Sequence, residues 1–126
     1  MTNLDRTEYG EQQALFEWAQ WAANQHPALH YLMAIPNGQY RPGQRMEAGL
    51  RYSKGVPDVF LPVPCKDKHG LWIELKMPGN EPTADQWEWL RFLSRQGYEA
   101  KVCYGFEEAQ TAILNYLSTL EVLNCG

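Results

Sequence analysis

The chain has 126 residues, enough for one domain with a substantial hydrophobic core but too few for two. Its net charge of −4 lacks the basic excess typical of nucleic-acid-binding proteins, although the distribution of charge matters more than the sum. No stretch is long and apolar enough for a transmembrane helix, and the first residues do not resemble a secretory signal, so we expect a cytoplasmic protein without a membrane partner.

The first predicted element is a helix from about Asp5 to Gln25, which stops at His26 because Pro27 cannot continue it. Its apolar positions recur at spacings of three and four, as a buried helical stripe requires, and they are Leu15, Trp18, Ala19 and Ala22.

Followed backwards, the same stripe becomes polar and reaches Gln12, Glu11 and Glu8. Acidic residues favour the start of a helix because they meet the positive end of its dipole. The alternative is that this end of the helix borders a functional site and contributes a carboxylate. The pattern itself supports both interpretations equally.

Short elements fill the middle of the chain. Residues 28–35 are predicted to form an apolar strand that ends in the Pro36-Asn37-Gly38 turn, and residues 43–52 a short helix. Residues 58–63 form an apolar strand, and a polar hairpin loop, 64–70, connects it to a strand at 71–76. Cys65 and His69 in this loop could share a metal, but no second pair completes a zinc site, so we interpret them as ordinary loop residues.

The last third predicts a helix, a strand and a helix. Thr83 and Gln86 form a capping-box pattern for a helix that runs to Gln96 and ends before Gly97. Residues 98–104 alternate as a strand, and a final helix follows Gly105. The predicted buried positions are Trp87, Leu90 and Leu93 in the first helix and Phe106, Ala109, Ile113 and Leu117 in the second. The order αβ(α)ββαβα predicts a single α/β domain, residues 1–126, with a mixed sheet flanked by helices.

Pro57-Asp58 and Glu74-Leu75-Lys76 carry the chemistry. On a strand, Glu74 and Lys76 share one face while Leu71, Ile73 and Leu75 point to the core. If the two strands pair, Asp58 and Glu74 meet at one end of the sheet and can share Mg²⁺ or Mn²⁺, which prefer oxygen ligands. The alternative is a solvated strand face, but charges on a sheet covered on both sides are costly unless paired or bound to a metal.

A basic segment lies between the first and second predicted strands. It carries Arg41, Arg45, Arg51 and Lys54, with Glu47 as its only acid. Such a segment could contact DNA phosphates, although many runs of charge are simply solvated.

The sequence resembles the VRR-NUC group of the PD-(D/E)xK nucleases over most of its length. The resemblance rests on Glu8-x-x-x-Gln12, Ile35-Pro36-Asn37-Gly38, Gly55-Val56-Pro57-Asp58, Trp72-Ile73-Glu74-Leu75-Lys76 and Thr83-Ala84-Asp85-Gln86. It implies a restriction-endonuclease-like fold and a Mg²⁺- or Mn²⁺-dependent endonuclease of structured DNA. In that family pattern the metal ligands correspond to Asp58, Glu74 and the Leu75 carbonyl, and the active-site lysine to Lys76.

The remaining family positions are less specific. The helix-one glutamate corresponds to Glu8, with Glu11 one turn along as a rival, and Gln86 matches a family glutamine that the capping box explains equally well. The resemblance also implies a homodimer that cleaves four-way junctions or other branched duplexes in a bacterial or phage-infected cell. The aromatics Trp21 and Trp89, which lie off the main predicted buried stripes, are candidates for its interface. The alternatives are a nickase or flap endonuclease, and a DNA-binding module without activity.

Overall fold

A computed structural model describes residues 6–36 and 54–123 of the chain. Along the sequence it contains α1 (Glu8–Ala22), η2 (Pro27–Tyr31), β1 (Met33–Ala34), β2 (Val59–Leu61), β3 (Leu71–Lys76), α2 (Ala84–Arg95), β4 (Glu99–Tyr104) and α3 (Phe106–Leu123). None of the described helices is long and apolar enough to cross a membrane.

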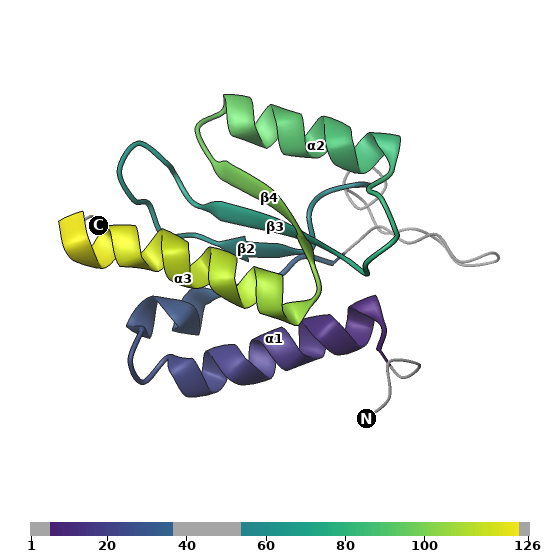
Figure 1. The fold of residues 1–126 in the computed structure, drawn as a ribbon. Coiled ribbons are helices and arrows are strands. Elements are labelled where there is room, and N and C mark those ends of the chain that lie inside the picture. The colour runs from purple at the N-terminus through teal and green to yellow at the C-terminus, as the bar shows by residue number, and fades with distance from the viewer. Residues whose placement is uncertain (1–5, 37–53, 124–126) are drawn as a thin grey trace.

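The four strands form one mixed sheet in the order β1-β2-β3-β4. β2 is antiparallel to β1 and to β3, whereas β3 and β4 are parallel and are joined through α2. Figure 1 shows α2 on one side of the sheet and α1 and α3 on the other. The predicted α/β class is confirmed, and β1 and β4 are the outermost of the described strands.

The hydrophobic core lies between the sheet and the α1–α3 pair. Alternate side chains of β3 point into it, as the period of two requires, and the α1 and α3 stripes meet them there. The fully buried members include Leu15, Leu71, Ile73, Leu75, Ile113 and Leu117. The opposite face of β3 therefore carries Trp72, Glu74 and Lys76.

One predicted element has a different secondary structure in the described residues. Instead of one strand over residues 28–35, the chain forms the 3-10 helix η2 followed by a strand of only two residues. Pro27 at the first position of η2 presets its φ angle for a helical turn, and Leu29 alone of these residues is buried. The predicted helix at 43–52 lies outside the described residues.

The predicted buried face of α2 is wrong at one position. Leu90 and Leu93 are buried, but Trp87 is 37% exposed. At 3.6 residues per turn, Trp87 and Leu93 lie on opposite sides of Leu90, each about 60° from it, so a narrow contact with the sheet covers only one of them. The capping box at Thr83 and Gln86 is confirmed, since each residue's side chain accepts a hydrogen bond from the other's main-chain N–H.

Gly55, in the loop before β2, packs closely against the start of α2. Gly55 has a φ angle of 91°, and a Cβ built on it would lie 2.8 Å from the main-chain carbon of Asp85. Gly79 has a similar φ of 94°, but nothing lies within 4 Å of its added Cβ. A Cβ at Gly79 would therefore add only backbone strain, whereas a Cβ at Gly55 would add both backbone strain and a steric clash.

We expect Gly79→Ala to destabilise the protein by about 1–2 kcal/mol, the cost of a left-handed φ angle for a residue with a Cβ. Gly55→Ala should cost more, because the loop must also move away from the main chain of α2. Urea unfolding followed by tryptophan fluorescence measures both variants. Equal losses of stability would contradict the close approach of Gly55 to α2.

Candidate active site

Two carboxylates lie side by side at one end of the sheet. The β2–β3 register pairs Val59 with Ile73, so Asp58 stands opposite Glu74, with both side chains on the face away from the α1–α3 core. Asp58 Oδ2 accepts a hydrogen bond of 2.9 Å from the main-chain N–H of Leu75. The structure thus brings together the two acids that the sequence pattern singled out.

Pro57 explains a second feature of this end of the sheet. The same register, continued by one pair of strand positions, places Pro57 opposite Leu75. The carbonyls of Gly70 and Lys76 accept hydrogen bonds from the β4 side, so the main-chain groups of Leu75, one residue away, point toward β2. Since proline has no N–H, it cannot donate to the Leu75 carbonyl, while the Leu75 N–H is taken by the Asp58 carboxylate.

Glu74 is held in an unfavourable environment for a negative charge. Its residue is 1% exposed, and its Oε1 atom is buried with no hydrogen-bond partner among the described residues. Burial above all, and then the neighbouring Asp58 carboxylate, raise the pKa of Glu74 to about 9, while Lys76 opposes the rise. At neutral pH this carboxyl group therefore carries a proton unless a cation replaces it.

Lys76 is the positive group of the site. It is 9% exposed, and its Nζ lies 3.9 Å from Glu74 Oε2, at the outer limit of an ion pair. The strand alternation predicted from the sequence places both side chains on one face of β3. An ammonium group at this distance can compensate the negative charge of the two carboxylates only in part.

The structure separates the two helix-one candidates. Glu8 is half-buried in the first turn of α1, close enough for its charge to raise the pKa of Glu74. Glu11 instead accepts hydrogen bonds from Arg6 Nη2 at 2.6 Å and from the main-chain N–H of Phe106 at 3.1 Å. The hydrogen bond from Arg6 lowers the pKa of Glu11, so its carboxylate stays ionised.

The other candidate residues lie apart from the carboxylate pair. The side-chain oxygen of Gln86 accepts a 2.8 Å hydrogen bond from the N–H of Thr83, as the cap requires. Lys54 is exposed and lies 3.6 Å from Asp85 on α2. The arginines Arg41, Arg45 and Arg51 lie outside the described residues. Cys65 is buried in the core while His69 packs edge-on against Tyr98, so these two do not form a common site.

The donor set fits a hard cation. Among the described residues, no group of three or more His, Cys, Asp and Glu side chains could hold a metal ion. The strand register does bring two carboxylates, those of Asp58 and Glu74, next to the main chain of Leu75. Carboxylate and carbonyl oxygens suit Mg²⁺ and Mn²⁺, which retain several waters in such sites. The unpartnered Oε1 of Glu74 and its raised pKa are what a buried carboxylate suited to binding a cation is expected to show.

Sequence reasoning missed two residues that shape this site. Arg6 precedes α1 and is not part of the predicted buried stripe, yet it forms an ion pair with Glu11. The sequence predicts Gly105 only as a break before the last helix, although a Cβ there would lie 3.1 Å from both Arg6 and Glu11. An arginine just before a helix is a weak sequence signal for the ion pair, and no sequence signal indicates the contact at Gly105.

The order of the elements and this site together define an α/β protein of the PD-(D/E)xK type. The acid at the start of β2 and the acid-x-lysine at the end of β3 meet on one face of a mixed sheet. This is the arrangement that the resemblance implied.

Comparison with known proteins identifies the family. The model of the VRR-NUC domain matches residues 7–107, so the chain belongs to the VRR-NUC family, and a nuclease-type function on DNA follows at that level. A solved structure described as a VRR_NUC domain protein superposes with a TM-score of 0.72 over 90% of each chain, at 23% sequence identity, which shows the shared fold. The search of curated proteins found no match.

The raised pKa of Glu74 predicts how the stability of the metal-free protein depends on pH. Between the unfolded value of 4.5 and about 9, the folded protein keeps a proton that the unfolded chain releases, so stability falls as pH rises across this window. Each unit of pKa difference is worth about 1.4 kcal/mol, so the loss between pH 5 and pH 8 should exceed that amount. Urea unfolding in chelator at several pH values measures it.

Glu74→Gln provides the matched control for this prediction. The amide cannot ionise, so the variant should be more stable than the wild type at pH 8 and should lose much less stability between pH 5 and pH 8. Parallel pH profiles for the two proteins would contradict the assignment of the buried proton to Glu74.

Proposed function

We propose that this protein is a Mg²⁺- or Mn²⁺-dependent endodeoxyribonuclease that hydrolyses phosphodiester bonds at the Asp58–Glu74–Lys76 site. The observation that carries the proposal is the pairing of the buried Glu74 with the half-buried Asp58. One carboxylate oxygen of Glu74 has no partner among the described residues, and the other lies 3.9 Å from Lys76 Nζ. A cluster that leaves a carboxyl group poorly compensated reduces stability, and such perturbed groups gather at functional sites.

The metal ligands in this proposal are Asp58, Glu74 and the Leu75 carbonyl. Bound there, Mg²⁺ or Mn²⁺ would supply Lewis acidity toward a phosphate oxygen and lower the pKa of a coordinated water. The hydrogen bond from the Leu75 N–H to Asp58 Oδ2 orients the carboxylate, and Pro57 leaves the Leu75 carbonyl without a strand donor.

The other residues act on water and on the phosphate. Lys76, a triple donor on a buried strand end, would orient the attacking water and balance the negative charge that develops at phosphorus. Glu8, in the first turn of α1, is close enough for its charge to act on Glu74. It would accept a hydrogen bond from a water molecule at the site or help to hold a second cation. Glu11 and Gln86 have structural partners, which favours Glu8 as the third carboxylate.

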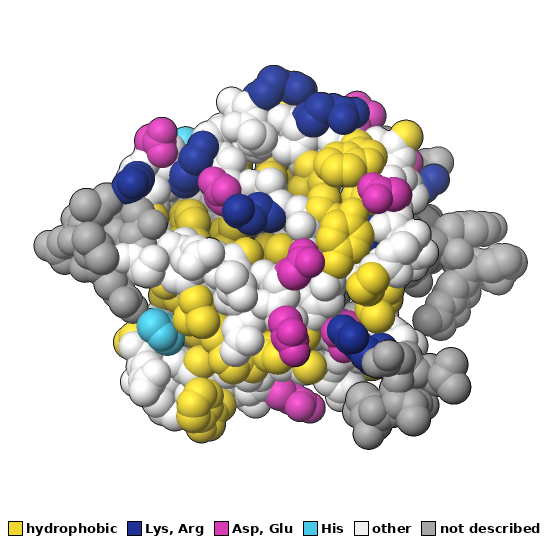
Figure 2. All heavy atoms as spheres, in the orientation of Figure 1, with side chains coloured by type: hydrophobic (Ala, Val, Ile, Leu, Met, Phe, Trp, Pro, Cys, Tyr) yellow, Lys and Arg dark blue, Asp and Glu magenta, His cyan; other side chains and the backbone are white. Residues whose placement is uncertain are grey.

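The proposed substrate is structured DNA, with the four-way junction as the first candidate. On the face shown in Figure 2, Lys and Arg side chains are interspersed with Asp and Glu, so this view presents no single basic surface. The proposal therefore assigns phosphate contacts to Lys54 and to Arg41, Arg45 and Arg51 of the preceding segment. A less selective nickase or flap endonuclease would use the same chemistry, so only substrate comparison distinguishes them.

We expect Asp58→Ala, Glu74→Ala and Lys76→Ala each to reduce cleavage by at least 100-fold without unfolding the protein. Their side chains lie on the face opposite the hydrophobic core, so the packing of β3 should survive. The assay compares four-way, flap, single-stranded and linear duplex DNA in Mg²⁺, in Mn²⁺ and in chelator. Circular dichroism checks that each variant is folded.

Two results would contradict parts of this proposal. Metal-dependent cleavage by purified Asp58→Ala would remove the site from consideration. Binding of DNA by the wild type without cleavage of any of the four substrates would favour a non-catalytic module of the same fold.

We also propose that two copies act together, because one active site cannot cut two strands of a junction at once. A C2 dimer would present two sites to strands related by the approximate two-fold symmetry of the junction. Trp21 is 69% exposed and remains a candidate for the interface, whereas Trp89 is partly covered and packs edge-on against Phe92. 

Light scattering should give a mass of about twice the 14.5 kDa of one chain, because a stable C2 pair is expected in solution before DNA is added. The same measurement with junction DNA controls for assembly on the substrate. A mass of one chain under both conditions would argue against the dimer and leave the nickase as the better candidate.

A further inference from the structure

A chain of short contacts connects the first turns of α1 to the main chain of Lys76. Arg6 Nη2 donates to Glu11 Oε1 at 2.6 Å, and the same oxygen accepts the N–H of Phe106 at 3.1 Å. One residue earlier, the N–H of Gly105 donates to the Lys76 carbonyl at 3.0 Å. A single carboxylate oxygen therefore connects α1 to the corner between β4 and α3, and that corner is bonded to the strand end that carries the site.

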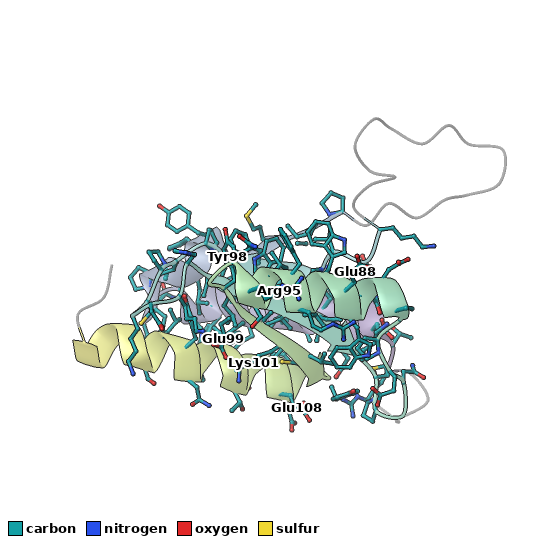
Figure 3. All side chains as sticks on the ribbon, turned by 90° about the horizontal axis from the view of Figure 1, so that it is seen from above. Glu88, Arg95, Tyr98, Glu99, Lys101 and Glu108 are labelled. Atoms are coloured by element: carbon teal, nitrogen blue, oxygen red, sulfur yellow. The ribbon has the colours of Figure 1, made fainter. Side chains whose placement is uncertain are left out.

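The corner between β4 and α3 is built to receive this carboxylate. Phe106 begins α3, so its N–H is one of the donors that a helix start leaves without a partner inside the helix. Two residues before Phe106, the N–H of Tyr104 donates to Glu108, which Figure 3 labels on α3 beside the end of β4. Gly105, with a φ angle of 93°, leaves the space in which Arg6 and Glu11 meet.

The geometry of α1 relates this contact to the proposed active site. Glu8 precedes Glu11 by three residues, so the two side chains lie on neighbouring positions of one helix face. A shift or rotation of α1 at Glu11 moves Glu8 relative to Glu74 by a similar amount. The N–H of Gly105, next to Phe106, donates to the Lys76 carbonyl, so a displacement of this corner would also disturb the main chain of Lys76.

We infer that Glu11 is a positioning residue, which holds Glu8 and Lys76 in place around the carboxylate pair through its bonds to Arg6 and Phe106. The inference rests on the proposed function, since it concerns the geometry of that site. Removing such a supporting residue typically reduces metal affinity or activity by about 10–100-fold, while leaving the metal ligands themselves intact.

The test uses the full-length protein with four substitutions. They are Glu11→Ala, Glu11→Gln, Glu8→Gln as the reference for a catalytic carboxylate, and Glu17→Gln as a matched control on the exposed side of α1. Binding of Mn²⁺ without DNA is measured by calorimetry, amide hydrogen exchange is followed at Gly105 and Phe106, and junction cleavage is measured as a function of Mn²⁺ concentration. Thermal unfolding confirms that each variant is folded.

Glu11→Ala should weaken Mn²⁺ binding by about tenfold or more and accelerate exchange at Phe106 and Gly105. Glu11→Gln should recover part of both losses, because its amide oxygen still accepts the Phe106 N–H although the charge facing Arg6 is gone. It also keeps the inference testable if Glu11→Ala does not fold. Glu17→Gln should match the wild type in all three measurements.

Three outcomes would overturn the inference. Faster exchange at Phe106 with unchanged Mn²⁺ affinity and unchanged cleavage would reduce Glu11 to a purely structural cap. A Glu11→Gln variant as inactive as Glu8→Gln at saturating Mn²⁺ would make Glu11 itself a catalytic carboxylate. A wild type that neither binds Mn²⁺ nor cleaves DNA would overturn the proposed function, and this inference with it.

Discussion

The contact between Asp58 Oδ2 and the main-chain N–H of Leu75 is the interaction on which the site depends. The Asp58 carboxylate, just before β2, takes the place of the main-chain acceptor that would otherwise pair with Leu75 of β3. Pro57 makes this exchange possible, because it removes the N–H that would continue the strand ladder. The regular sheet therefore ends at the residues where the candidate chemistry begins.

Burial makes this end of the sheet electrostatically unfavourable without a cation. The buried Glu74 lies opposite the half-buried Asp58, and Lys76, whose Nζ is 3.9 Å from Glu74 Oε2, offsets only part of their charge. The metal-free protein lowers the cost by keeping a proton on Glu74. A bound divalent cation would achieve the same compensation with both acids ionised, which connects the raised pKa of Glu74 to the proposed metal dependence.

The rest of the fold supports these groups from both sides of the sheet. On one side, the core cluster of α1, α3 and β3 fixes the direction of the β3 side chains through Ile73 and Leu75. On the other, the start of α2 is packed against Gly55, immediately before Pro57 and Asp58. The start of β2 thus lies against the start of α2 through Gly55. The end of β3 lies against the start of α3, where the N–H of Gly105 donates to the Lys76 carbonyl.

The sequence by itself determined the α/β class, the core stripe of α1, the capping box of α2 and the shared face of Glu74 and Lys76. All of these follow from local periodicity or from residues a few positions apart. The sequence pattern wrongly predicted a full strand at residues 28–35 and a buried Trp87. Both depend on which residues contact the sheet, and local periodicity does not determine this. Only the tertiary structure distinguished Glu8 from Glu11, which share one helical stripe. The difference arises from the Phe106 N–H, a partner 95 residues away in sequence, and no local pattern encodes such a contact.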